Sequence, residues 1–194
     1  MPALVAVLAG IVMGHLSGGS IRNLASLHLR GEALIVAAFA LQAIARGRFV
    51  AVAGYPSMAV GAWVVASVAL TITLLANTRI PGALVCALGV MLNLLVVLAN
   101  GAMPVGHVPG AVEVSSLGQG VAASFYRFTD ASTLAAFAGD VLPLRLLSMA
   151  MLLSIGDVLL MAGVCTAVVA SMLSRPDMGS PDTQLGIKDS CTIL

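Results

Sequence analysis

The sequence predicts an all-α protein that crosses a membrane with a bundle of about five helices. Hydrophobic residues make up 60% of the 194 residues and charged residues only 9%, and the mean hydropathy is +1.08. A soluble domain usually carries about 25% charged residues, so this chain could not cover a soluble fold with polar side chains. Long segments lack charge altogether or contain only Asp157, and each is long enough to cross a bilayer. They are Met1–Ile21, Phe49–Thr78, Ile80–Val112 and Leu146–Ser174.

Five spans follow from these segments. The second span is the weakest, because Glu32 and Arg46 leave only a short uncharged stretch between them. It crosses only if Arg46 and Arg48 extend their charged groups to the membrane surface. The spans form one bundle, residues 1–173, and residues 174–194 form a polar C-terminal tail. The expected spans are Pro2–Gly18, Gly31–Val52, Ser57–Asn77, Gly82–Asn100 and Leu146–Leu173.

Residues 101–145 form the one long connection between expected spans. Loops of this length tend to be either functional or disordered. Two apolar stretches, Val121–Phe128 and Leu134–Phe137, argue against disorder. Asp130 is a residue type that starts helices, so we expect a short helix from there to about Ala138. The loop is therefore predicted to be a partly helical, ordered cap over the bundle.

Basic residues near the ends of the spans decide the expected orientation. Their totals on the two sides are nearly equal, but Arg22 and Arg30 follow the first span and no charged side chain precedes it. This predicts a multi-pass protein of the plasma membrane with the N-terminus and the long loop outside and the C-terminus in the cytoplasm. The expected partner is the lipid bilayer. Basic residues are too scattered for nucleic acid.

A stripe of small residues follows one face of the first span. Ala6, Gly10, Gly14 and Gly18 are each four residues apart, which places them on one face of a helix. Such a face allows another helix to approach closely. Packing within the bundle is one interpretation, and self-association or contact with another membrane subunit is the alternative.

Polar residues inside the spans are the first candidates for a site. Counted from the long loop, Asn93 lies about 10 Å below Asn100 and Asp157 roughly 16 Å from Leu146, which places both in the same half of the membrane. An acidic residue at such depth should face protein or water rather than lipid. Asp157 could hydrogen-bond to Asn93 or Ser154 between helices, line a ligand or ion pocket, or carry protons or act as a catalytic acid.

The loop contributes further candidates, although none of them forms a known metal motif. The spacing of His107, Glu113, Asp130 and Asp140 matches neither a His-Glu-x-x-His nor a paired Cys-x-x-Cys pattern, so no metal site is predicted and no cofactor is identified. The candidate ligand-binding residues share polarity and a place in the outer half of the bundle or in the loop. They are Gln42, Asn93, Asn100, Ser154, Asp157, Asp140 and His107.

Several short segments resemble an uncharacterised bacterial family of multipass membrane proteins. They are Asn100–Val105, with Asn-Gly-x-Met-Pro, Thr133–Asp140, and Ser154–Val158, with Ser-x-Gly-Asp. The resemblance covers most of the chain up to about Leu173, although Ala102 stands where that family has glycine. It implies a bacterial plasma membrane but no activity. It draws attention to Asn100, Met103, Pro104, Asp140 and Asp157.

Three functions remain open at this point. The first is binding or transport of a small solute in a polar pocket beneath residues 101–145. The second is a non-enzymatic assembly subunit of a membrane complex. The third is an intramembrane enzyme that uses Asp157 with Asp140 or His107. An enzyme is the least favoured, because no nucleophile and base pair is recognisable.

Overall fold

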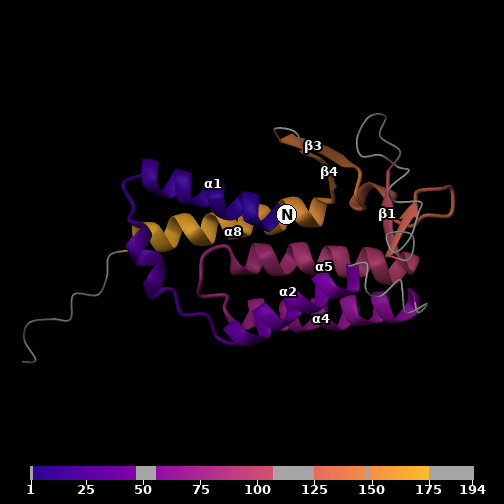
Figure 1. Ribbon diagram of the computed structural model, residues 1–194, viewed down its shortest axis with the longest axis horizontal. Helices are drawn as coiled ribbons and strands as arrows, with labels where there is room; N and C mark the ends of the chain where they lie inside the picture. Colours follow the sequence, from indigo (N-terminus) through magenta and orange to yellow (C-terminus); the bar gives the residue numbers. More distant parts are fainter. Residues whose placement is uncertain (1, 47–55, 107–124, 147–148, 175–194) are drawn as a thin grey trace, which may run out of the picture.

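The computed structural model describes residues 2–46, 56–106, 125–146 and 149–174 (Figure 1). Its bulk is helical, as predicted. Three of its helices, α4, α5 and α8, are long and apolar enough to cross a membrane, whereas α1 and α2 have 15 residues each and are shorter than a usual span. The helices are α1 (Pro2–Leu16), α2 (Glu32–Arg46), α4 (Pro56–Ala76), α5 (Ala83–Asn100) and α8 (Ile155–Leu173).

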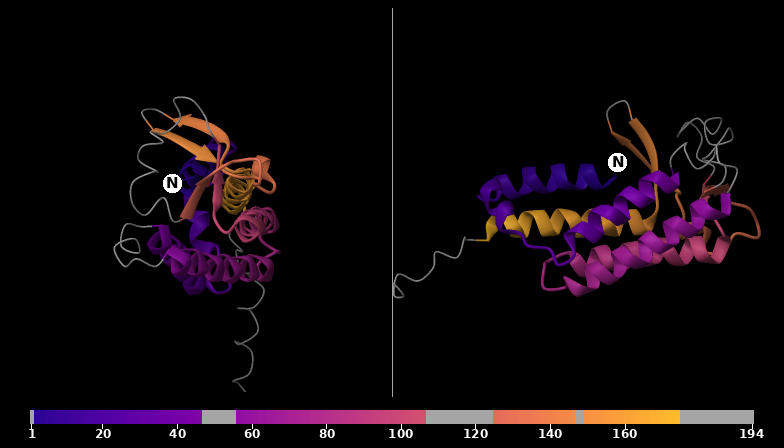
Figure 2. Two further views of the ribbon diagram at one scale, coloured as in Figure 1. Left: turned by 90° about the vertical axis from the view of Figure 1, so that its right-hand side faces the viewer. Right: turned by 60° about the horizontal axis from the view of Figure 1, so that its bottom comes forward.

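The helices form an open arc rather than a closed ring. α1 packs along α8, α8 along α5, α5 along α4, and α4 along α2. The two end helices, α1 and α2, are not packed along each other, and the end-on view in Figure 2 shows the opening of the arc between them. One side of the bundle therefore has a longitudinal gap bordered by α1 and α2.

The predicted glycine face of α1 lies against α8 at two of its positions. A Cβ atom on Gly10 would come within 2.8 Å of Val168 Cβ, and one on Gly14 within 2.6 Å of Met172 Sδ. Gly18 differs, because it lies beyond the last residue of α1 and has a φ of +82°. A Cβ atom added to it would have no neighbouring atom within 4 Å. Gly18 therefore serves the turn after the helix, where glycine is favoured.

Two glycine pairs bring α5 and α8 closest together. Gly82 and Gly89 are seven residues apart near and on α5, and Gly156 and Gly163 are seven apart on α8. Because the helices run antiparallel, Gly82 meets Gly163 and Gly89 meets Gly156, with a Cβ on Gly156 only 2.5 Å from Gly89 O. Small residues permit such backbone approach between membrane helices. The Gly89–Gly156 contact places the first turn of α8 beside the middle of α5.

The expected span Leu146–Leu173 is wrong in its first part. Instead of a helix from Leu146, the chain forms an antiparallel hairpin of β3 (Leu142–Leu146) and β4 (Met149–Leu153), and α8 begins at Ile155. Composition could not separate the two, because a short apolar run is compatible with strand or helix. Ser154 and Asp157, three residues apart, mark the start of the helix in the sequence. In the structure they form a capping box, in which Ser154 Oγ accepts a hydrogen bond from Asp157 N at 2.9 Å.

The cap contains short strands, and turns with one 3₁₀ turn take the place of the helix expected from Asp130 to about Ala138. β1 (Met103–Val105) and β2 (Tyr126–Phe128) pair in parallel, and after β2 the described part of the cap contains a short 3₁₀ turn, η2 (Ala136–Ala138). Asp130 starts a turn rather than an α-helix, and its carboxylate accepts hydrogen bonds from the hydroxyl and the backbone N–H of Ser132 at 2.6 and 2.8 Å. These bonds, led by that from the hydroxyl, lower the pKa of Asp130.

Two asparagine side chains, Asn77 and Asn23, connect segments at the opposite end of the bundle. Asn77, just after α4, accepts from Arg30 N at 2.8 Å and donates to Arg30 O at 2.9 Å, so one side chain holds both backbone groups of one residue. Asn23, in the 3₁₀ helix η1 (Ile21–Ser26), donates to Met172 O at 2.8 Å. Carbonyl groups that helix ends leave unpaired are thus satisfied by neighbouring segments.

Candidate ligand cavity beneath the cap

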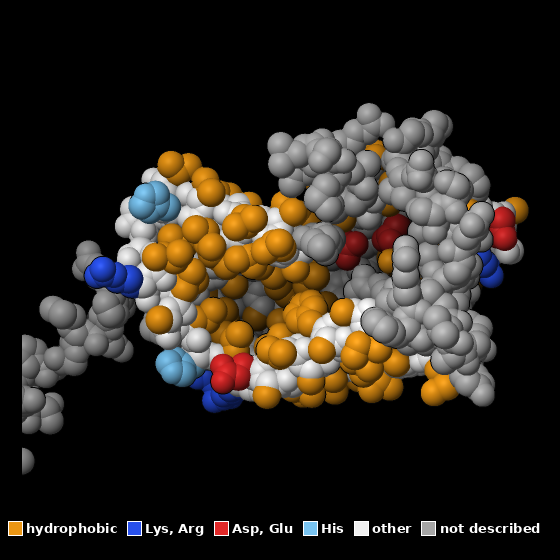
Figure 3. Space-filling view, viewed as in Figure 1, with side chains coloured by type: hydrophobic (Ala, Val, Ile, Leu, Met, Phe, Trp, Pro, Cys, Tyr) orange, Lys and Arg blue, Asp and Glu red, His pale blue; other side chains and the backbone are white. Residues whose placement is uncertain are grey.

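A cavity of about 680 Å³ lies where the bundle meets the cap. All five helices contribute to its wall, together with cap residues around β1 and β2. Figure 3 shows this face of the molecule hollowed between α1 and α2, with acidic side chains at the bottom of the hollow. The described lining residues are Ala3, Phe39, Gln42, Ala43, Trp63, Leu70, Val90, Asn93, Met103, Phe125, Tyr126, Asp140, Asp157 and Leu160.

Asn93, Ser154 and Asp157 form a closed set of hydrogen bonds beside the cavity. Asn93 Nδ2 donates to Asp157 Oδ1 at 3.1 Å, and Ser154 Oγ donates to Asn93 Oδ1 at 2.8 Å. Ser154 N also donates weakly to Asp157 Oδ2 at 3.4 Å. Both carboxylate oxygens therefore act as acceptors. The helix-capping geometry and the Gly89–Gly156 contact hold Asp157 in one orientation toward the cavity.

Asp157 is paired with Asn93, as their similar depths in the sequence indicated, but it lies closer to the start of its helix than predicted. Asp157 lies in the first turn of α8 rather than well inside a helix that starts at Leu146. It nevertheless meets Asn93, which is about 10 Å along α5 from Asn100. The two residues share one level because α8 itself begins beside Asn93 rather than at the end of α5.

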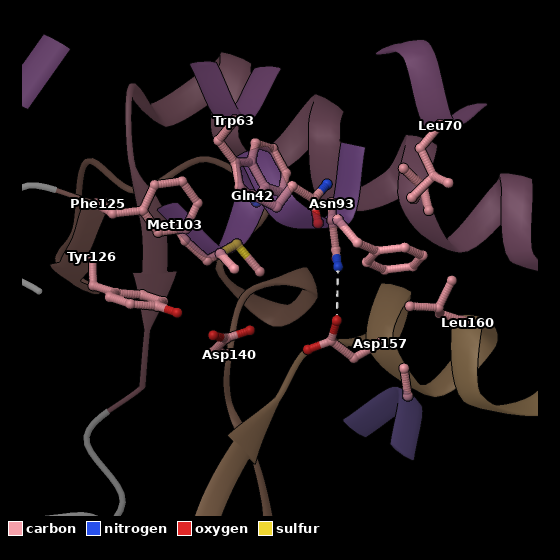
Figure 4. A pocket seen from close by; sticks show the side chains of 14 residues that line it. Gln42, Trp63, Leu70, Asn93, Met103, Phe125, Tyr126, Asp140, Asp157 and Leu160 are labelled. Atoms are coloured by element: carbon pink, nitrogen blue, oxygen red, sulfur yellow. Dashed lines mark hydrogen bonds between the residues drawn. The ribbon is translucent and has the colours of Figure 1, made fainter. Parts of the chain in front are cut away.

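The strand pairing of the cap places three side chains over the cavity. Met103 is paired with Tyr126, and Val105 is bridged to Asp140, so the alternation along β1 directs these side chains to one face. Asp140 N donates to Pro104 O at 2.8 Å, which anchors it to the strand. In Figure 4, Asp140 and Asp157 lie along one side of the cavity and the aromatic rings of Trp63 and Phe125 lie opposite.

An aromatic cluster of Trp63, Phe125 and Tyr126 lines the cavity, with Trp63 and Phe125 opposite the carboxyl groups. The ring centroids of Trp63 and Phe125 are 5.3 Å apart, and those of Phe125 and Tyr126 are 5.1 Å apart. Trp63 is 5% exposed, and its indole Nε1 has no hydrogen-bond partner within the described ranges. A buried indole N–H usually finds an acceptor, so a molecule in the cavity could supply one.

Gln42 connects this wall to the bundle. It is buried, at 6% exposed, and its Nε2 donates to Ser67 Oγ at 3.0 Å. Ser67 Oγ in turn donates to Trp63 O at 2.8 Å. The chain of hydrogen bonds orders the Gln42 amide at the boundary between α2 and α4.

The structure brings four of the seven candidate residues into the cavity wall: Gln42, Asn93, Asp140 and Asp157. Ser154 is fully buried behind Asp157 and supports it. Ser154 and Asn100 are not among the described residues that line the cavity, and His107 is not among the described residues.

Asn100 and His107 have different outcomes. Asn100 accepts from Leu134 N at 2.9 Å and donates to Leu134 O at 3.0 Å, repeating the arrangement of Asn77 with Arg30. It thus positions the cap on α5 rather than lining the cavity. His107 lies outside the described residues.

Sequence reasoning missed the aromatic wall. Trp63 is the only tryptophan of the chain, and its place in an apolar segment suggested nothing beyond a hydrophobic residue. The parallel pairing of β2 with β1 brings Phe125 and Tyr126 close to Trp63, and no local sequence pattern predicts this pairing. In the described part of the chain, no group of three or more His, Cys, Asp or Glu side chains could hold a metal ion.

These features define a membrane-type helix bundle with a polar cavity beneath a small β-containing cap. Its three long apolar helices are consistent with an integral membrane protein. The model of a family of unknown function, DUF5317, matches residues 26–169, well over half of the chain. The protein therefore belongs to this family, which confirms the resemblance to an uncharacterised family. Neither a curated protein nor a solved structure matches the chain.

Proposed function

We propose that this is a multi-pass membrane protein that binds a small solute in the cavity beneath the cap, as a carrier or a receptor for it. The observation that supports this is the composition of the cavity wall. Ligand pockets are typically ~300–1,000 Å³, mostly apolar, with a few placed polar groups. At about 680 Å³, with Asn93, Asp140 and Asp157 set among apolar side chains, the cavity fits that description.

The alternatives have less support. The glycine face that suggested an assembly subunit is occupied at Gly10 and Gly14 by α8 of the same chain. An enzyme would use Asp157 with Asp140, but Asp157 is engaged by Asn93 and Ser154, and no nucleophile accompanies the two carboxyl groups among the described lining residues. Binding is therefore the function that the geometry supports best.

Quenching of the single tryptophan tests whether solutes reach the cavity. Trp63 lines it, so acrylamide, a small uncharged quencher, should quench its fluorescence in the purified protein. Ala43→Phe, which fills the cavity from α2, should reduce the quenching constant at least about twofold by excluding the quencher. Ala40→Phe, on an exposed position of α2 that is not part of the lining, is the matched control and should leave it unchanged. Equal quenching in all three proteins would contradict a solute-accessible cavity.

We further propose that all five helices cross the plasma membrane, with the cap outside. The support is the alternating direction of the helices and the exposed Arg22, Arg30 and Arg79 at the end opposite the cap, where basic residues favour the cytoplasm.

Cysteine labelling in intact cells checks this orientation. In a background without native cysteines, Ser132→Cys in the cap should react with a membrane-impermeant maleimide. Thr78→Cys, exposed between α4 and α5, should react only after lysis. The reverse pattern would invert the orientation, and labelling of both in intact cells would mean that no membrane separates the two ends.

A further inference from the structure

We infer that the ligand of this cavity is an organic ammonium ion attached to an apolar body. The inference rests on the proposed function and names its substrate class. It is carried by three features of the cavity: an oriented acidic group, an aromatic wall facing it, and an apolar extension that opens between α1 and α2.

The acidic group is Asp157. Its hydrogen-bond donors in the described structure are an amide and a backbone N–H, at 3.1 and 3.4 Å, and neither is charged. The described lining contains a second carboxyl group, Asp140, and neither Lys nor Arg. A carboxylate within a membrane bundle is costly unless an opposite charge offsets it. A bound cation would supply that charge.

The aromatic wall decides which kind of cation fits. Trp63, Phe125 and Tyr126 form a continuous cluster. Trp63 and Phe125 lie across the cavity from the carboxyl groups, and Tyr126 lies beside Asp140 (Figure 4). Aromatic faces attract organic cations, tryptophan most strongly, and the attraction increases when the site is desolvated. A bare metal ion would need several oxygen ligands, and the described residues offer no such group. An alkylated ammonium group instead matches both walls.

The apolar body has its own part of the cavity. Leu70, Val90 and Leu160 line the side away from the cap, and Leu70 and Val90 are buried. The cavity wall also includes Ala3 of α1 and Phe39 of α2, the two helices that border the gap of the arc. The hollow in Figure 3 lies in this gap. A molecule can therefore place its ammonium group near Asp157 while its apolar part extends between α1 and α2.

The test uses Trp63 fluorescence of the full-length protein in neutral maltoside micelles. Three probes share a six-carbon chain: hexyltrimethylammonium, 1-hexanol and hexyl sulfate. We expect a saturable change with hexyltrimethylammonium at a concentration at least about tenfold lower than with 1-hexanol, and none with hexyl sulfate. Asp157→Asn, which keeps the shape of the side chain and one acceptor oxygen, should weaken hexyltrimethylammonium binding about tenfold or more, while the melting temperature falls by no more than about 4 °C. Asp130→Asn, an exposed acid of the cap, should have no effect.

Competition identifies the source of the ammonium group. Displacement by a short-chain phosphatidylcholine, but not by the matching phosphatidylglycerol or by choline, assigns the ligand to membrane lipid. Displacement by choline at equal or lower concentration assigns it to a water-soluble amine. Equal affinity for 1-hexanol, unchanged affinity in Asp157→Asn, or no response to any probe would overturn the inference. The acrylamide experiment is independent of charge, so it shows separately whether the cavity itself is open.

Discussion

Gly156→Val is expected to destabilise the protein by about 3 kcal/mol, the upper end of the cost of overpacking a tight interface. A Cβ atom at this position lies 2.5 Å from Gly89 O and 2.6 Å from Asn93 Cγ. The backbone carbonyl cannot rotate away as a flexible side chain would, so α5 and α8 must separate. For a chain of this size the change corresponds to roughly 6–12 °C in melting temperature, measured in detergent.

Gly61→Val is the matched control for this substitution. Gly61 is a glycine within α4 with nothing within 4 Å of its Cβ direction. The same exchange there should alter the unfolding free energy by no more than about 0.5 kcal/mol. Similar melting temperatures for the two variants would show that the Gly89–Gly156 contact does not hold α5 to α8.

Asp157→Leu is expected to have the second large effect. It removes the acceptor for Asn93 Nδ2 and Ser154 N and half of the capping box of α8. Each buried donor left without an acceptor costs about 1–3 kcal/mol, so the folded yield and the melting temperature should both fall. Chemical denaturation or thermal melting in detergent measures the loss.

Asp157→Asn separates the two roles of this residue. Asparagine has a single acceptor oxygen, so it can still accept from Asn93 Nδ2 but not also from Ser154 N. The lost bond is the weak one, at 3.4 Å, so stability should fall by no more than about 1 kcal/mol. The large effect of this substitution should be on the affinity for the ammonium probe. If Asp157→Asn melts as early as Asp157→Leu, the negative charge itself stabilises the fold. If both variants melt like the unchanged protein, the hydrogen bonds around Asp157 contribute little.

The mostly helical fold, with apolar helices long enough to cross a membrane, was predictable from the sequence alone. The apolar runs are long enough to cross a bilayer, and the chain has few polar side chains for a soluble surface. The pairing of Asn93 with Asp157 was also predictable, since polar groups at similar depth in a bundle tend to find each other. The close approach at Gly10 and Gly14 followed from helical periodicity in the same way.

The cap and the cavity were decided only by the tertiary structure. The apolar segment before Ser154 suits a strand as well as a helix, and only the pairing of Leu142–Leu146 with Met149–Leu153 makes it a hairpin. Asn100 has the composition of a ligand-binding residue, but its contact with Leu134 assigns it to holding the cap. The wall of Trp63, Phe125 and Tyr126 joins segments distant in sequence. Contacts of this kind depend on how the helices and strands meet, and no local pattern of residues records that.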